Sequence, residues 1–233
     1  TFGQGTRIRR PVLIASSGTR QLMCDLIEHP SSWGPYLDLA ANLECDGSPE
    51  AAERILVRLI RIVPGEPQAY LLAARLAMAR SDTAKAAPLA SRALMFAPNL
   101  SPAYEILAQR LSERQRPARA IRACFQAFTA EPASPSAFER LMQELMRANE
   151  FTRMIRFAGD LAMKVPNQAQ IYFWLGRAKR LVGYTADAEA DLDRALSLDP
   201  NFATMIRYTR ETVTLSEAKD LIAKARRTTD PAR

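Results

Sequence analysis

The chain has 233 residues and a mass of 25.9 kDa, with 48% apolar and 24% charged residues. These proportions are typical of globular proteins and argue against wholesale disorder. The longest apolar stretch, 55–63, is interrupted by Arg58 and Arg61, so no segment is long and uncharged enough to span a membrane. The net charge is 32 − 25 = +7. A basic protein can attract nucleic acid or anionic lipid, but an arginine-biased proteome explains this charge more simply.

The first residues, 1–15, are predicted to form a flexible N-terminal lead. After them, residues 19–28 have apolar side chains at helical spacing and predict one helix. This helix occupies the segment 16–32, which we interpret as a degenerate half-repeat in front of the repeats described next.

Prolines recur every 34 residues through most of the chain: Pro30, Pro64, Pro98, Pro132, Pro166 and Pro200. Aromatic residues keep the same period: Tyr36, Tyr70, Tyr104, Phe138 and Tyr172. A fixed period of this length indicates stacked supersecondary units. We therefore predict five repeats, 33–66, 67–100, 101–134, 135–168 and 169–202, in which the proline is position 32 and the aromatic residue is position 4.

Each repeat is predicted to be a pair of helices, A and B, because apolar residues stand at positions 4, 7, 8 and 11 and again at 20, 24, 27 and 28. Small residues at positions 8 and 20, such as Ala40 and Ala52, allow the two helices to cross closely. Gly47 and Gly183, both at position 15, predict a left-handed residue in the A–B turn. Pro88 lies inside a predicted helix B and predicts a kink or a delayed helix start there.

After the fifth repeat, residues 203–228 are predicted to be two capping helices. The first, 203–213, corresponds to a sixth helix A. The second begins at a capping box, 214–217, and extends to about residue 227. Residues 229–233 are predicted to be a tail.

These columns resemble the tetratricopeptide repeat, which has an aromatic residue at position 4, Leu at 7, Gly or Ala at 8, Ala at 20 and 27, and Pro at 32. The fifth repeat matches best, through Tyr172, Leu175, Gly176, Ala188, Ala195 and Pro200. The resemblance covers 33–202 and implies an all-α fold: a right-handed α-α superhelix (solenoid) of tandem helix-turn-helix repeats. Repeat 4 departs from the pattern, with Met142 and Met154 at the two small positions.

In the resembled family, helix A residues at positions 2, 5, 6, 9, 12 and 13 line a concave face that holds peptides or partner helices. The resemblance therefore implies the following candidate partner-groove residues: Leu71, Leu72, Arg75, Met78, Ile106, Arg140, Phe173, Trp174, Arg177, Arg180, Arg207 and Tyr208. Aromatic and arginine side chains carry much of the binding energy at interfaces, and arginines pair with carboxylates. The expected partner is another protein, as a peptide or helix of acidic and hydrophobic character. For Phe173 and Trp174 a second role stays open, as cap residues packed against the last two helices.

Catalytic and metal-binding patterns are missing from the sequence. Three separated cysteines and one histidine, His29, argue against a Cys/His metal site and against Ser–His or Cys–His catalysis. We expect no cofactor and no small-molecule substrate. Five arginines between Arg110 and Arg122 could meet phosphates, but a solvated turn explains them more simply, and nucleic acid is not the expected partner.

The sequence thus predicts a non-enzymatic protein–protein interaction scaffold or adaptor, of bacterial type. The alternative is the non-catalytic recognition region of a larger enzyme, such as a glycosyltransferase or sulfotransferase, of which this chain is a fragment. The expected compartment is the cytoplasm. The periplasm is the alternative, since the chain starts at Thr1 and not at Met. The sequence does not predict the oligomeric state.

Overall fold

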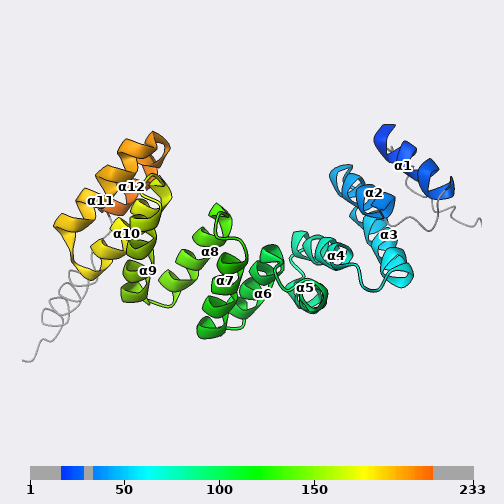
Figure 1. Ribbon diagram of the computed structural model, residues 1–233, viewed down its shortest axis with the longest axis horizontal. Helices are drawn as coiled ribbons and strands as arrows, with labels where there is room; N and C mark the ends of the chain where they lie inside the picture. Colours follow the sequence, from blue (N-terminus) through cyan, green and yellow to red (C-terminus); the bar gives the residue numbers. More distant parts are fainter. Residues whose placement is uncertain (1–16, 29–33, 212–233) are drawn as a thin grey trace, which may run out of the picture. The chain divides into compact units, whose positions relative to one another are not determined.

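The computed structural model describes residues 17–28 and 34–211. Within these ranges the chain forms twelve α-helices and one short 3-10 helix, with no strand (Figure 1). The predicted N-terminal lead, the second capping helix and the tail lie outside the described residues. The all-α fold class is confirmed.

The helices follow one another in pairs along the chain. A first helix, α1 (Ser17–Glu28), precedes five pairs and a last helix. The pairs are α2 (Gly34–Cys45) with α3 (Pro49–Ile62), α4 (Pro67–Ala79) with α5 (Thr83–Phe96), α6 (Ser101–Glu113) with α7 (Pro117–Ala130), α8 (Pro135–Arg147) with α9 (Phe151–Lys164), and α10 (Ala169–Val182) with α11 (Thr185–Leu198). The 3-10 helix η1 (Pro200–Phe202) leads into α12 (Ala203–Glu211).

Each helix B ends two residues before the proline of the 34-residue period. Thus α3 ends at Ile62 ahead of Pro64, and α5 ends at Phe96 ahead of Pro98. The residue between them leaves the helical region, as at Val63, where φ is −128° and ψ is 81°. Its N–H still bonds to the carbonyl of Leu59. A residue before proline avoids the α conformation because of the proline ring. The proline that recurs every 34 residues therefore determines where each helix B ends.

The turn between helices A and B has the same backbone feature in every pair. The residue at position 15 has a positive φ in all five pairs: Gly47 (72°), Ser81 (59°), Gln115 (54°), Asn149 (57°) and Gly183 (102°). The left-handed residue predicted from the two glycines is therefore present, and it also occurs where the sequence has a residue with a side chain.

Close crossing of helices A and B is visible in the burial of positions 8 and 20. Ala40 and Ala52 are fully buried, as are the corresponding alanines of the next two pairs. In the fifth pair, a Cβ added at Gly176 would lie 2.9 Å from the carbonyl oxygen of Ala188 and 2.8 Å from the Leu192 side chain. Met142 and Met154 occupy these positions in the fourth pair and are also fully buried.

One of the two effects expected of Pro88 on helix B, a delayed start, is absent. Pro88 does not delay the start of α5, which begins at Thr83 and continues through the proline. The start is fixed instead by Asp82, whose side chain accepts a hydrogen bond from the backbone N–H of Lys85 over 3.0 Å. Such an N-cap satisfies a donor that the first helical turn leaves free.

The chain divides into two compact units, the N-terminal unit ending at Ala137 and the C-terminal unit beginning at Phe138. In the N-terminal unit, each helix from α1 to α7 contacts the next, and α4 also contacts α2 and α6. Its core is built mainly from leucines and alanines on the facing sides of these helices, including Leu39, Leu56, Ala74 and Ala90. In the C-terminal unit, α10 packs between α9 and α11, and α12 contacts α11.

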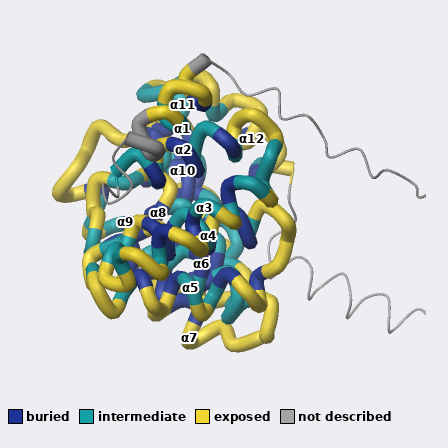
Figure 2. The backbone as a smooth tube through the Cα atoms, turned by 90° about the vertical axis from the view of Figure 1, so that its right-hand side faces the viewer, coloured by how far each residue is buried: buried dark blue, intermediate teal, exposed yellow. Residues whose placement is uncertain are grey.

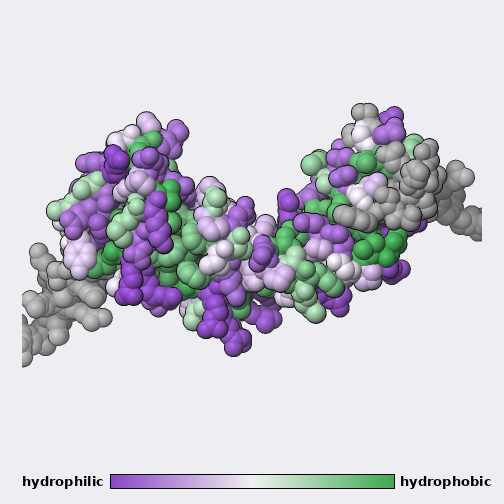
Figure 3. Space-filling model, viewed as in Figure 1, coloured by the Kyte–Doolittle hydropathy of each residue, from purple (hydrophilic) through white to green (hydrophobic). Residues whose placement is uncertain are grey.

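Buried and exposed residues alternate along the helices (Figure 2), as expected for amphipathic helices that each bury one side. Hydrophobic side chains also reach the surface among hydrophilic ones in both units (Figure 3). They include Val57, Met95 and Phe96 in the N-terminal unit and Met163 and Tyr208 in the C-terminal unit.

Candidate binding surface

A surface cavity of about 220 Å³ lies between α2 and α4 in the N-terminal unit. It is lined by Leu37, Asp38, Ala41, Gln68, Leu71, Leu72 and Arg75. All of them stand at positions 2, 5, 6 or 9 of the first two repeats. Three of the predicted groove residues, Leu71, Leu72 and Arg75, are thus brought together. The other four lining residues, Leu37, Asp38, Ala41 and Gln68, are not among the twelve candidates, although their positions in the repeat identify them as groove residues.

The cavity has apolar walls and a charged rim. Leu71 is only 7% exposed and belongs to the core, whereas Leu37 and Leu72 are half-buried and pack against a core cluster from the side of the cavity. Asp38 and Arg75 are exposed, and neither forms an ion pair with any residue in the described ranges. The cavity therefore offers apolar contact flanked by one unpaired carboxylate and one unpaired guanidinium.

Two other predicted residues of this unit do not line the cavity. Ile106 is 7% exposed and belongs to a core cluster formed with residues of α4 and α5. Met78 is half-buried and packs against that cluster. Their apolar character is explained by packing between α4 and α6.

A second, smaller cavity of about 110 Å³ lies among α3, α4 and α5. Its apolar lining includes Val57, Ile60 and Leu89, and its rim carries Glu53, Arg80 and Lys85. Glu53 pairs with both cations, at 3.0 Å from Arg80. The hydrogen bond from Lys85 lowers the pKa of the Glu53 carboxyl against the opposing effect of burial. These rim charges satisfy one another, which makes this cavity a weaker candidate for a charged ligand.

In the C-terminal unit, two of the three predicted aromatic residues are inside the fold. Phe173 is 1% exposed and Trp174 is 4% exposed. Their rings meet edge to face with centroids 5.5 Å apart, and Phe173 also contacts the ring of Phe202 at 5.3 Å. This burial favours the capping role that the sequence left open for the two residues.

Arg177 lies on the indole of Trp174. Its guanidinium carbon is 5.3 Å from the centre of the ring, within the range of a cation–π interaction. The side chain is half-buried. Burial lowers the pKa of the Arg177 guanidinium, and the charge interaction with Tyr208 partly offsets this effect.

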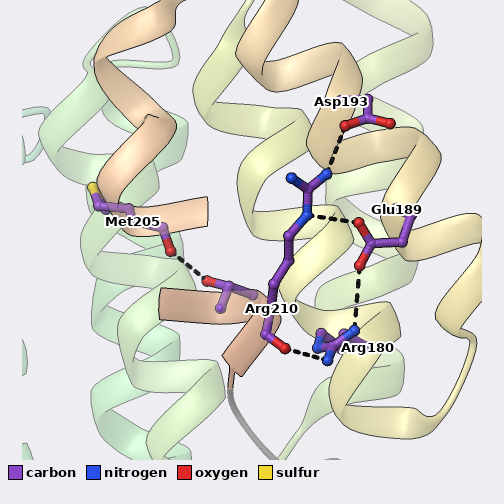
Figure 4. A network of polar contacts seen from close by, with 6 residues as sticks. Arg180, Glu189, Asp193, Met205 and Arg210 are labelled. Atoms are coloured by element: carbon purple, nitrogen blue, oxygen red, sulfur yellow. Dashed lines mark hydrogen bonds and ion pairs between the residues drawn. The ribbon is translucent and has the colours of Figure 1, made fainter. Parts of the chain in front are cut away.

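Arg180, three residues further along α10, has a structural role. It pairs with Glu189 of α11 at 3.3 Å and donates a hydrogen bond to the backbone carbonyl of Arg210. Arg210 of α12 in turn contacts Glu189 at 2.7 Å and Asp193 at 2.6 Å. This network, drawn in Figure 4, ties α12 to α10 and α11.

The remaining predicted residues differ in exposure. Arg140 is half-buried beside the almost fully buried Glu144, with Nε 3.9 Å from its carboxylate. Arg207 and Tyr208, on α12, are exposed, and Tyr208 is 65% exposed. Arg177, Arg207 and Tyr208 therefore remain available at the surface of this unit, whereas Arg180 does not.

Among the described residues there is no cluster of three or more His, Cys, Asp or Glu side chains suited to a metal ion. None of the helices in that part of the chain is long and apolar enough to cross a membrane.

Comparison of the sequence with protein-family models and with curated proteins finds no match. Comparison of the fold with solved structures finds similar proteins. YrrB, described as a TPR protein with an unusual peptide-binding site, is 14% identical with a TM-score of 0.64, and the match covers 83% of this chain and 100% of that one. MamA from Desulfovibrio magneticus RS-1 is 16% identical with a TM-score of 0.58, covering 80% and 98%. PilF of Pseudomonas aeruginosa is 15% identical with a TM-score of 0.57, covering 78% of each chain.

At such low identities the likeness concerns the fold, and it agrees with the helix pairs and the 34-residue period. The fold of this chain is that of the tetratricopeptide-repeat proteins.

Proposed function

We propose that the chain is a protein–protein interaction scaffold that holds a segment of its partner against the exposed sides of its A helices. The observation that carries this proposal is the α2–α4 cavity, whose lining comes entirely from positions 2, 5, 6 and 9. The description of YrrB as a peptide-binding TPR protein supports the same kind of function.

The size of the cavity favours a polypeptide over a small molecule. Pockets for drug-sized ligands and cofactors usually enclose about 300–1,000 Å³, and this cavity encloses about 220 Å³. It is large enough for one or two side chains of a bound segment, the rest of which would lie along the helix surface.

The lining also suggests what the segment contains. Leu37 and Leu72 provide contact for an apolar side chain, and Arg75 can pair with a carboxylate through two parallel hydrogen bonds. Asp38, across the cavity, can accept a hydrogen bond from a backbone N–H of the segment. We therefore propose a partner segment with apolar and acidic residues.

A selection of random peptides displayed on phage, with the full chain as bait, provides the test. Selected peptides should be rich in apolar and acidic residues, and Arg75→Glu should weaken their binding about tenfold or more. Arg92→Glu is the matched control, because Arg92 is exposed on α5, away from the cavity. Equal effects of the two variants on the dissociation constants measured by fluorescence polarisation would reject the cavity as the binding site.

A further inference from the structure

We propose that Arg177, supported by Trp174, is a carboxylate-binding subsite in the C-terminal unit. Its ligand is a glutamate or aspartate side chain of a partner protein. The inference rests on the proposed function in that the partner is a polypeptide. It concerns a different unit of the chain from the α2–α4 cavity and has its own test.

The first observation is the missing counter-charge. Five basic side chains of the C-terminal unit are half-buried: Arg140, Arg177, Lys179, Arg180 and Arg210. Four of them are within 4 Å of a carboxylate. Lys179, for example, lies 2.7 Å from Asp191, and Arg210 lies 2.6 Å from Asp193. Arg177 is the exception, with no ion pair or hydrogen bond to any residue that the structure describes.

Such an arrangement is costly unless something compensates for it. A charged group loses hydration when it is partly buried, and proteins normally pair such groups. The lowered pKa of the Arg177 guanidinium reflects this loss, although arginine remains protonated at neutral pH. A ligand carboxylate would supply the pairing that the neighbouring cations obtain from their own chain.

The second observation is that the guanidinium is held in place. The cation–π contact with Trp174, at 5.3 Å, fixes Arg177 against a ring that is itself 4% exposed. A guanidinium stacked in this way keeps its N–H donors in a rigid fork that matches a carboxylate. The edge of Arg177 is thus available for two parallel hydrogen bonds.

The third observation concerns α12, which carries Arg207 and Tyr208 and is held against α10 and α11. The Arg210 side chain binds Glu189 and Asp193 of α11, and the Arg210 backbone carbonyl accepts a hydrogen bond from Arg180 of α10 (Figure 4). Within α12, the Thr209 hydroxyl donates a hydrogen bond to the Met205 carbonyl. This helix carries Tyr208, whose charge interaction with Arg177 raises the pKa of the guanidinium against the larger, opposing effect of burial. Tyr208 and Arg207 are both exposed on this helix, and Arg207, without an ion pair in the described ranges, adds positive charge to this unit.

A carboxylate is favoured over the phosphates of a nucleic acid. Binding of a polyphosphate backbone depends on several cations acting together, whereas here the remaining half-buried cations of the unit are already paired with acidic side chains. Nucleic-acid binding is therefore kept as an outcome of the test.

Trp174 provides the readout, because its indole lies against Arg177. The other tryptophan, Trp33, is replaced by Phe so that the fluorescence of the full chain reports Trp174 alone. Three probes are titrated: an acetylated ten-residue peptide of alternating Glu and Leu, the same peptide with Lys for Glu, and a single-stranded DNA 10-mer. We expect a saturable change with the acidic peptide and none with the basic one.

Arg177→Gln should weaken binding of the acidic peptide about tenfold, which is the loss of one charge-assisted hydrogen-bonded pair. Arg194→Gln removes the same charge from an exposed site on α11 and should change binding less than about twofold. Arg177→Lys, which keeps the charge but not the fork, should lie between them. Circular dichroism confirms that each variant is folded.

Equal weakening by Arg177→Gln and Arg194→Gln would overturn the subsite, because net charge alone would then explain binding. Equal binding of the acidic and basic peptides would overturn it as well, and so would tighter Arg177-dependent binding of the DNA. If Arg177→Gln is silent while Arg75→Glu still weakens the phage-selected peptides, the scaffold function stands and this inference fails. The reverse pattern would reject the α2–α4 cavity and keep the subsite.

Discussion

The hydroxyl of Tyr70 donates a hydrogen bond to the backbone carbonyl of Pro64 over 3.0 Å. Pro64 follows helix B of the first pair, and Tyr70 lies in the first turns of helix A of the second pair. The bond therefore joins the two kinds of residue that recur every 34 positions, at the junction between neighbouring pairs. Tyr70 is 4% exposed, so its hydroxyl has little access to water as an alternative partner.

Tyr70→Phe should lower the free energy of unfolding by about 1 kcal/mol, because the Pro64 carbonyl loses its donor while the ring packing is kept. Urea denaturation followed by circular dichroism measures the change. Tyr184→Phe, at a side chain that is 58% exposed, is the control and should have no measurable effect. A neutral Tyr70→Phe variant would show that the junction does not depend on this bond.

Gly176→Ala should destabilise the C-terminal unit by about 1–3 kcal/mol through overpacking. The added Cβ would lie 2.9 Å from the Ala188 carbonyl oxygen, which belongs to backbone and cannot move aside easily. Gly159→Ala is the matched control in α9, where an added Cβ meets nothing within 4 Å. That control should raise stability by about 0.5–1 kcal/mol, since alanine favours helix over glycine. Melting temperatures of the two variants that shift in the same direction would contradict a close crossing of α10 and α11.

At the left-handed position of the A–B turn, introducing a glycine and removing a glycine should change stability in opposite directions. Gln115 has a φ of 54°, which a residue with a Cβ adopts at a cost of about 1–2 kcal/mol. Gln115→Gly should therefore raise the free energy of unfolding by about 0.5–1 kcal/mol after allowance for the greater freedom of glycine in the unfolded chain. Gly183→Ala, at a φ of 102°, should lower it by about 1 kcal/mol or more. Chemical denaturation checks both values, and a loss of stability in Gln115→Gly would refute the argument.

Trp174→Ala should cost about 3–5 kcal/mol of stability, as expected for truncation of a large buried aromatic residue. The ring is 4% exposed and contacts both Phe173 and Arg177. This variant is therefore unsuitable as a test of binding, which is why Arg177 is substituted instead. A melting temperature that stays within one or two degrees of the parent chain would show that the indole is not a packing element.

The repeat pattern predicts much of the fold because two chemical effects act at fixed spacing. Proline ends helix B two residues ahead of itself, and small residues at positions 8 and 20 determine where the two helices cross. Pro88 shows the limit of this reasoning, since a capping aspartate, Asp82, starts α5 ahead of the proline. The left-handed conformation at Ser81, Gln115 and Asn149 was also not predicted from those residues. Asparagine adopts it more readily than most residues, but Ser81 and Gln115 have no such preference and adopt it under the geometry of the pair.

The candidate site is predicted less completely. Position in the repeat placed Leu71, Leu72 and Arg75 in one cavity, but Phe173 and Trp174 occupy corresponding positions and are buried. The difference arises from contacts that join distant parts of the chain, such as Phe173 with Phe202. Pairing of charges is equally invisible in the sequence: Arg177 and Arg180 are three residues apart on α10, yet only Arg180 meets a carboxylate.

The helices that contact one another within each unit are neighbours in sequence or next but one. A chain with such short-range contacts closes only small loops as it folds, and low contact order is associated with fast folding. Structure can form first in any adjacent set of helices and spread outward from there. Folding of this chain should therefore start in one set of adjacent helices and extend to their neighbours. A substitution that slows the formation of one helix pair should leave the folding rate of distant helices unchanged.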